Sequence, residues 1–252
     1  MDGLFDYKGE ITGNLAKVQV LEELSEILSN NNKKMKILDV GCVGIIPFEI
    51  WTPLLSNSKY DFDLYGVDIQ GIEKAKEIIK RQGWKNVQIM QCSGYDLSKS
   101  FQKDYFDIIV STQVLEHIKY IILFLKNIYD VAKEGGIIFL TLDSAHYPRN
   151  FGIKRLVMRI LDFLGKEKYH NIPLHDYDIE QIFDKIGLKV IDKRFYNINP
   201  LKEIHNHKVS SELKNNILQK WKNLEDLLNK DIEFINNNKN YFMGLYYKLK
   251  KV

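Results

Sequence analysis

Hydrophobic residues along the first 142 positions follow two alternating patterns, short continuous runs and stripes with helical spacing. The stripes predict helices over residues 14–28, 48–51, 72–81 and 118–131, the second being interrupted by Pro53. The continuous runs predict strands at residues 35–40, 63–68, 87–90, 107–110 and 137–142. Because strands and helices alternate, the sequence predicts an α/β fold with a doubly wound parallel sheet and helices on both faces.

The pattern changes after residue 142. The later segments predict a basic amphipathic stripe at 153–164, a helix at 179–186 ended by Gly187, a strand at 188–195, and a final strand at 241–249. A long helix carries Leu213, Ile217, Trp221, Leu224 and Leu228 on one side, which predicts a face for the core or for a dimer partner.

We therefore predict a single domain over residues 1–252 with a mostly parallel, seven-stranded sheet. Its parts are an N-terminal helix within 1–34, a core at 35–196 with a helical cap inserted at about 145–175, a helical insertion at 200–238, and the final strand at 239–252.

Composition narrows the class of protein. The chain has 252 residues, of which 45% are hydrophobic and 27% charged, as in an ordinary globular protein. The net charge of +3 is too small to indicate a nucleic-acid partner. The sequence offers no signal peptide and no apolar run of about 20 residues, and Cys42 and Cys92 lack metal-ligand spacing. We expect a cytoplasmic protein without a bound metal.

Two of the predicted strands end in an acidic residue followed by a loop. The first ends at Asp39-Val40-Gly41-Cys42 and the second at Val67-Asp68-Ile69. Neighbouring strands of this kind form one half of a nucleotide site, in which the first loop lets a ligand approach the backbone and the second carboxylate binds ribose hydroxyls. The sequence therefore predicts an adenosine-containing cofactor. Helix capping by Asp39 and a surface-turn role for Asp68 are the structural alternatives.

Four segments together resemble the class I S-adenosylmethionine-dependent methyltransferases. Residues 36–42 match that family's first motif, Val67-Asp68 its ribose-binding acid, residues 106–118 its fourth motif, and residues 135–140 the turn and strand that follow. The resemblance implies S-adenosylmethionine as cofactor. It also implies a set of cofactor-binding residues, namely Asp39, Gly41, Cys42, Gly44, Asp68, Ile69, Ser93, Gly94, Gln113 and Val114.

The chain departs from this family at two places. The first loop of the family reads Gly-x-Gly-x-Gly, but Val43 and Ile45 stand where glycine is usual. Val43→Gly is therefore expected to leave cofactor binding equal or tighter. Ser93 stands where the family has an acid that contacts the adenine amine, which removes one contact.

The acceptor is predicted by exclusion. The segment after the fourth strand lacks the Asp/Asn-Pro-Pro-Tyr/Phe sequence of amino-nucleobase methylators, and the chain lacks the Pro-Cys pair of pyrimidine C5 methylators. The methyl acceptor that is left is an oxygen or nitrogen atom of a small molecule or glycan. A non-catalytic relative that binds a ligand or partner subunit stays the alternative, and a nucleotide-dependent oxidoreductase is disfavoured because Gly-x-Gly-x-x-Gly is missing.

Histidines are the candidates for the catalytic base. His146 follows the carboxyl end of the fifth strand, where ligands bind in such sheets, and His175 lies in the predicted cap. His205 and His207 are expected to face solvent. The 153–164 stripe is predicted to be a lid, with membrane-surface contact as its alternative, and the sequence leaves the oligomeric state open.

Overall fold

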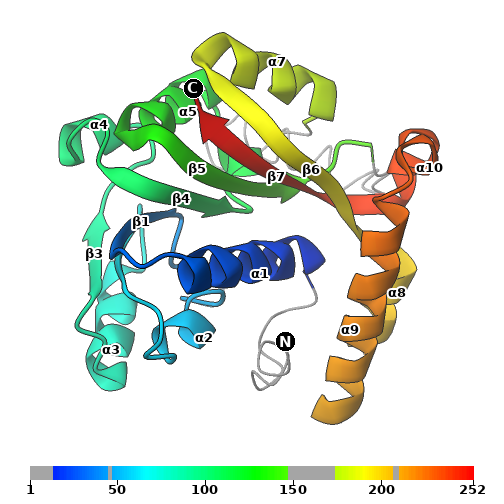
Figure 1. Cartoon of the computed structure of the whole chain (residues 1–252), viewed down its shortest axis with the longest axis horizontal. Helices are drawn as coiled ribbons and strands as arrows, with labels where there is room; N and C mark the ends of the chain where they lie inside the picture. The colour runs from blue at the N-terminus through cyan, green and yellow to red at the C-terminus, as the bar shows by residue number, and fades with distance from the viewer. Residues whose placement is uncertain (1–13, 45–46, 147–173, 207–209) are drawn as a thin grey trace, which may run out of the picture.

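The structure is a computed structural model, and it describes residues 14–44, 47–146, 174–206 and 210–252. In these residues seven strands form one sheet in the order β3-β2-β1-β4-β5-β7-β6 (Figure 1). The strands are β1 (Met35–Val40), β2 (Phe62–Asp68), β3 (Val87–Gln91), β4 (Phe106–Thr112), β5 (Ala132–Asp143), β6 (Leu188–Ile198) and β7 (Phe242–Lys251). All pairings among strands β1 to β5 are parallel, whereas β7 runs antiparallel to both β5 and β6. The predicted mostly parallel sheet of seven strands is confirmed.

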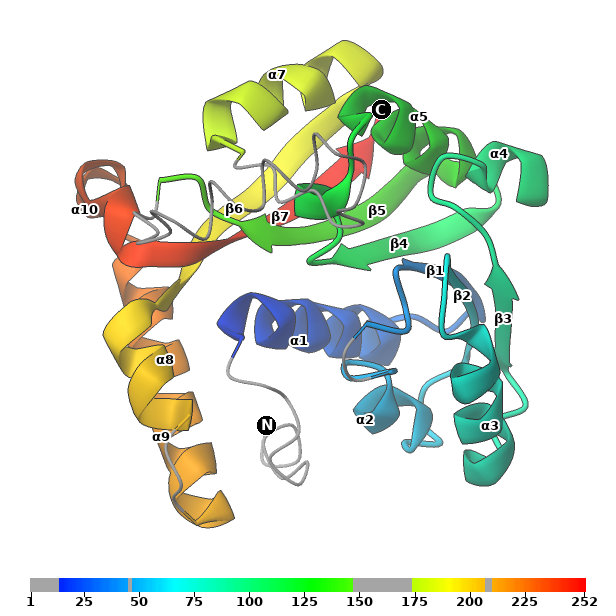
Figure 2. The same ribbon diagram turned by 180° about the vertical axis from the view of Figure 1, so that it is seen from behind.

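Helices cover both faces of the sheet, as Figures 1 and 2 show from opposite sides. The apolar residues of α1 (Leu15–Asn30), α2 (Thr52–Leu55) and α3 (Ile72–Gln82) pack on one face with Ile37 and Leu64. Those of α4 (Leu97–Ser100), α5 (Ile121–Val131) and α7 (Asp176–Ile186) pack on the other with Leu38 and Ile109. Successive β1 residues thus point into different cores, as strand geometry requires.

Two predicted helices begin later than their apolar pattern indicated. Residues 48–51 form turns, and α2 then starts at Thr52 with Pro53 in its first turn. Proline is tolerated there because the first backbone N–H groups of a helix have no intrahelical partner. The predicted helix at 118–131 is also shorter, because α5 starts only at Ile121; residues 115–117, just before the predicted range, form a separate 3₁₀ turn, η1.

The C-terminal helices are α8 (Asn199–Asn206), α9 (Ser211–Leu228) and α10 (Ile232–Asn238), followed by the 3₁₀ turn η2 (Lys239–Tyr241). The predicted apolar face of α9 is buried only in part, because Leu213 is 48% and Leu224 43% exposed, whereas Lys222 is only 2% exposed. A dimer partner for the exposed leucines stays a prediction. His205 of α8, expected in solvent, is buried beside Trp221, with ring centroids 6.1 Å apart.

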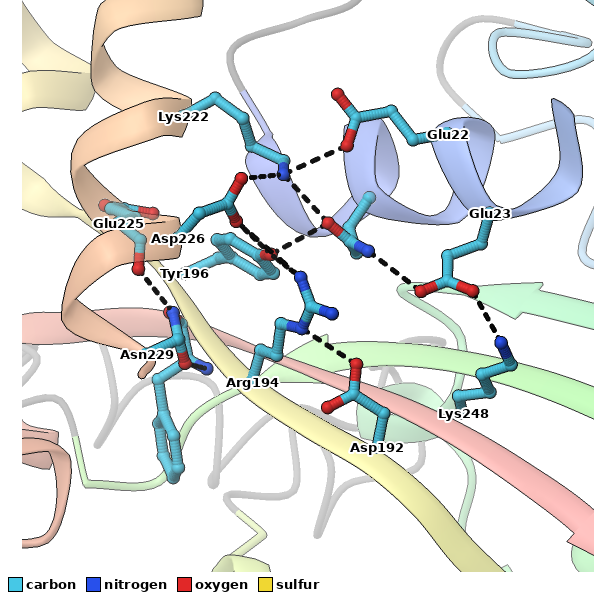
Figure 3. Close-up of polar contacts among 12 residues, drawn as sticks. Glu22, Glu23, Asp192, Arg194, Tyr196, Lys222, Glu225, Asp226, Asn229 and Lys248 are labelled. Carbon is cyan, nitrogen blue, oxygen red and sulfur yellow. Dashed lines mark hydrogen bonds and ion pairs between the residues drawn. The ribbon is translucent and has the colours of Figure 1, made fainter. Parts of the chain in front are cut away.

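A buried polar network explains this orientation of α9 (Figure 3). Lys222 Nζ lies 3.0 Å from a Glu22 carboxylate oxygen of α1 and 2.6 Å from one of Asp226. Glu225 is fully buried and accepts hydrogen bonds from the backbone N–H groups of Asn197 and Ile198, at 2.8 and 2.6 Å. Burial raises the pKa of Glu225 to about 7, although these N–H donors oppose the change. Charged side chains thus attach α9 to α1 and to the end of β6.

Candidate active site

The first loop of the site is bonded to the neighbouring strand. Gly41 directly follows β1, and its N–H donates to the carbonyl oxygen of Val67 at 2.8 Å. The N–H of Cys42 donates to the same oxygen at 3.3 Å. These bonds hold the loop against β2 at the carboxyl edge of the sheet, where parallel sheets of this kind bind ligands.

Only glycine fits at position 41. Its φ of +87° lies in the left-handed region, and an added Cβ would overlap the Cγ2 atom of Val114. Val114 follows β4, so the loops after β1 and β4 are in contact here. The structure therefore brings together two residues that the sequence assigned to the cofactor, although the contact between them was not expected.

Val43 and Gly44 differ in their surroundings. The Val43 side chain is buried over the β2–α3 turn, and a Cβ added to Gly71 would lie 2.6 Å from its Cγ1. Gly44 is exposed, with φ +48° and no atom within 4 Å of an added Cβ. The valine that replaces the usual glycine thus packs against the protein, and Ile45 lies outside the described residues.

Asp68 ends β2 beside an exposed apolar residue. Its two carboxylate oxygens accept backbone N–H groups from Val43 at 3.0 Å and from Gln70 at 3.3 Å. An ionised carboxylate has about four acceptor positions, so each oxygen keeps capacity for another donor. Ile69 is 63% exposed, unusual for a large apolar side chain that follows a buried strand. A ribose and an adenine ring fit this pair of features.

The remaining predicted cofactor residues lie at the ends of β3 and β4. The Ser93 hydroxyl accepts the N–H of Tyr95 at 3.2 Å, and a Cβ on Gly94 would overlap the Phe124 ring of α5. Gln113 leaves β4 with φ +55°, and its N–H donates to the carbonyl oxygen of Thr141 at 2.8 Å. Left-handed backbone at a residue other than glycine is uncommon and occurs often at functional sites.

Asp39 and Cys42 point away from the loop surface. Asp39 is 5% exposed and accepts a hydrogen bond from Trp51 Nε1 at 2.6 Å. Burial raises the pKa of Asp39 to about 7, and Asp68 adds to the effect. The Cys42 side chain packs on β2, where a Cβ on Gly66 would lie 2.8 Å from its sulfur, and burial raises the pKa of its thiol. Cys42 therefore offers a cofactor only its backbone.

A second cluster lies beyond β5. His146 and His175, which flank the undescribed segment 147–173, have ring centroids 4.7 Å apart. His146 Nε2 lies 2.7 Å from Asp176 Oδ1. The ring of His175 stacks on that of Tyr177 at 5.2 Å. The structure thus brings together both histidines that the sequence predicted as catalytic, whereas the 153–164 stripe lies outside the described residues.

Lys193 and Lys239 were missed by sequence reasoning. Their ammonium groups lie 3.0 and 2.7 Å from Asp176 Oδ2, and Lys193 also lies 2.8 Å from Glu180. Burial opposes ionisation of Asp176, but the hydrogen bonds from Lys239, His146 and Lys193 outweigh it and lower its pKa. No local pattern marks these lysines, because they come from β6 and η2 and meet α7 only through the topology of the sheet.

The described residues lack two further features. None of the helices there is long and apolar enough to cross a membrane. Within the same residues, groups of three or more histidine, cysteine, aspartate or glutamate side chains arranged to hold a metal ion are absent.

Comparison with known proteins gives the family. A sequence model of the methyltransferase domain matches residues 14–193. The mitochondrial ubiquinone biosynthesis O-methyltransferase of Mus musculus is 30% identical over 140 residues, covering 52% of this chain and 34% of that protein. The chain therefore spans about a third of the length of this relative.

Solved structures share the fold at low sequence identity. Geranyl diphosphate C-methyltransferase from Streptomyces coelicolor superposes with a TM-score of 0.60 and 10% identity, over 93% of this chain and 79% of that chain. The [4+2]-cyclase SpnF superposes with a TM-score of 0.57 and 14% identity, over 92% of this chain and 80% of that chain.

The fold is that of the class I S-adenosylmethionine-dependent methyltransferases, as the four sequence motifs indicated. The chain belongs to the methyltransferase domain family.

Proposed function

We propose that the protein transfers the methyl group of S-adenosylmethionine to an oxygen or nitrogen atom of a small molecule or glycan. The observation that carries the proposal is the arrangement at one edge of the sheet. The Gly41 loop and Asp68 end β1 and β2, and the His146–Asp176 pair follows β5 at the same edge. The name of the mouse relative, an O-methyltransferase, supports oxygen as the acceptor atom.

The cofactor contacts and the acceptance of the proton would fall to different residues. Asp68 would bind the ribose hydroxyls, Ile69 would contact the adenine ring, and the Gly41–Val114 contact would shape the floor for the methionine part. When bound, the cofactor supplies an activated methyl group, so that a carbon–oxygen bond forms as the carbon–sulfur bond breaks and its electron pair stays on sulfur. His146 would receive the proton that the acceptor hydroxyl loses, because imidazole titrates near neutral pH.

Cofactor binding and methyl transfer can be measured separately. S-adenosylhomocysteine should bind with a micromolar dissociation constant in titration calorimetry, roughly −8 kcal/mol, whereas NAD should not bind. Methyl transfer is followed with radiolabelled S-adenosylmethionine and a panel of hydroxylated aromatics, amines and sugars. No S-adenosylhomocysteine binding at millimolar concentration would overturn the proposal.

A non-catalytic role is the alternative, and one observation favours it. Both Asp68 oxygens already accept backbone N–H groups, so the carboxylate helps to hold the loop in place. The fold also serves the cyclase SpnF, whose name describes a different reaction. Tight S-adenosylhomocysteine binding without methylation of any compound in the panel would favour this alternative.

We also propose a cytoplasmic setting, supported by Cys42 and Cys92, which are both free thiols. Fractionation of cells that produce the protein would test it, and recovery from an oxidising compartment would contradict it.

A further inference from the structure

Asp176 has no predicted contact with the cofactor, yet it accepts the most hydrogen bonds of the carboxylates in the cluster beyond β5. We call this the acceptor-side cluster, and it consists of His146, His175, Asp176, Glu180, Lys193 and Lys239. Asp176 is 2% exposed and begins α7. One oxygen faces His146 Nε2 at 2.7 Å, and the other faces the ammonium groups of Lys193 and Lys239. Four separate segments of the chain therefore meet at this one side chain.

The charges around Asp176 determine where the His146 proton lies. With two ammonium groups within 3.0 Å, the carboxylate is ionised and can only accept hydrogen bonds. The hydrogen in the contact with His146 must then be on Nε2. In the neutral imidazole this leaves a lone pair on Nδ1, the other ring nitrogen.

The surroundings distinguish His146 from its neighbour His175. The buried Nδ1 atom of His175 has no hydrogen-bond partner in the described part of the chain, whereas Nε2 of His146 contacts the Asp176 carboxylate. The rings of His175 and Phe195 lie 4.7 and 6.4 Å from that of His146 and limit its rotation. Glu180, the other acid near the cluster, is bound by Lys193 and by the Tyr247 hydroxyl at 3.0 Å.

We propose that Asp176 is a positioning residue that fixes His146 as the Nε2–H tautomer, with Nδ1 ready to receive the acceptor proton, and that Lys193 and Lys239 hold Asp176 in place. This inference rests on the proposed methyl transfer. It assigns the role of the base to His146 and not to His175. It also includes η2 and β6 in the site, because they carry Lys239 and Lys193. Once the proton has moved to Nδ1, the imidazolium lies against a negative charge, which stabilises it.

Nitrogen NMR of the apoprotein, labelled with ¹⁵N-histidine, tests the tautomer without any acceptor. The His146 resonances are identified by their loss in His146→Ala. With the ring neutral, they should show a protonated Nε2 and an unprotonated Nδ1. Asp176→Asn should change this pattern toward a mixture of tautomers. Asp178→Asn, an exposed site in the same turn of α7, is the matched control and should leave it unchanged.

Two NMR outcomes would overturn the inference. A protonated Nδ1 in the wild-type protein would do so, even if Asp176→Asn failed to fold. An unchanged His146 spectrum in a folded Asp176→Asn variant would do so as well.

Activity gives a second, independent readout. With a hydroxylated aromatic from the panel as probe, Asp176→Asn should lose much of the roughly 10²–10⁴-fold that a general base contributes to turnover. Added to His146→Ala, it should cause little further loss, because both changes remove the same proton acceptor. Full additivity would mean that Asp176 acts only on structure and would overturn the inference.

The dissociation constant of S-adenosylhomocysteine should stay within about twofold in all these variants, because the cluster lies outside the proposed cofactor contacts. Loss of binding in the wild-type protein would instead defeat the proposed function, while the tautomer result would still stand.

Discussion

Asp39 and Asp176 are both buried at the same edge of the sheet, yet the pKa of Asp39 is raised and that of Asp176 is lowered. Asp39, below the cofactor loop, accepts a hydrogen bond from the neutral indole of Trp51, and burial raises its pKa to about 7. Asp176 has a histidine and two lysines, and its pKa is lowered. What separates the two aspartates is therefore the set of side chains that reaches them, because depth of burial is similar.

The difference extends to the regions around them. The cofactor edge is built from backbone hydrogen bonds, a left-handed glycine and close apolar contacts, so it depends on shape. The acceptor-side cluster is built from ion pairs between α7, β6 and η2, so it depends on charge. Substitutions that change volume should damage the first region most, and substitutions that change charge should damage the second.

Gly41→Val should have the largest effect, because the new side chain would overlap Val114 and would need an unfavourable φ. We expect S-adenosylhomocysteine affinity in calorimetry to fall more than roughly a hundredfold, a loss above about 2.7 kcal/mol. Gly44→Ala, where an added Cβ has open space, is the control and should lose far less. Unchanged affinity for Gly41→Val would show that the edge does not depend on shape.

Asp68→Ala should weaken S-adenosylhomocysteine binding roughly ten- to a hundredfold, because charge-assisted hydrogen bonds are worth roughly 1.5–3 kcal/mol. Part of the loss should come from the loop, since the N–H of Val43 loses its acceptor. Asp61→Ala, an exposed change just before the amino end of β2, should leave the dissociation constant unchanged. If the two variants bind equally well, the ribose lies elsewhere.

Asp39→Asn should alter how stability depends on pH. The folded-state pKa of about 7 exceeds the unfolded value of 3.8, so the folded protein binds more protons between these values. The unfolding free energy should therefore fall as pH rises through this window. The variant should lack this fall, which amounts to at most about 4 kcal/mol for a difference of about three pKa units. Urea unfolding of both proteins from pH 4 to 8 measures this difference. Identical slopes would contradict the assignment.

Asp176 should respond in the opposite direction. Its folded-state pKa lies below 3.8, so its contribution to stability is present at neutral pH and is lost as pH falls below that value. Difference profiles between the wild type and each asparagine variant therefore separate the two regions.

Val43→Gly should have the smallest effect, a loss of cofactor affinity of about threefold. The sequence alone favoured equal or tighter binding, because glycine is the usual residue. In the structure, however, the Val43 side chain packs over Gly71 and helps to fix the loop. Val43→Ala should fall between the two proteins in titration calorimetry. Tighter binding by Val43→Gly would restore the original expectation.

The sheet was predictable because its signals are local, whereas the individual cofactor contacts stay predictions. The apolar runs of β1, which ends at Val40, and of β2, which ends at Asp68, can be recognised within a few residues. The helices that stop at Gly83 and Gly187 end where the sequence predicted. The burial of Lys222 on α9 was not predictable. The apolar spacing indicated which side of α9 faces the core, but Lys222 is buried through contacts with Gln19 and Glu22, about two hundred positions away in the chain.

The acceptor-side cluster could be predicted only in part. His146 follows the fifth strand and was therefore a candidate from its position. The carboxylate that orients it lies 30 positions further on, and Lys239 lies 63 positions beyond that carboxylate. Charged residues at such separations resemble ordinary surface residues until the antiparallel β7 brings them together.

The parallel bridge between Ser144 and Leu174 has a consequence for which side chains can change beside His146 and His175. The Ala145 N–H donates to the carbonyl oxygen of Leu174 at 3.1 Å, and the Ser144 N–H donates to that of Met243 at 2.8 Å. Both contacts are made by backbone groups, which every residue except proline can supply as donor and acceptor. The backbone beside His146 and His175 is therefore held to β7 without the help of the Ala145 and Leu174 side chains. Substitutions of similar size at these two positions can change the surroundings of the histidines while this attachment to the sheet is kept.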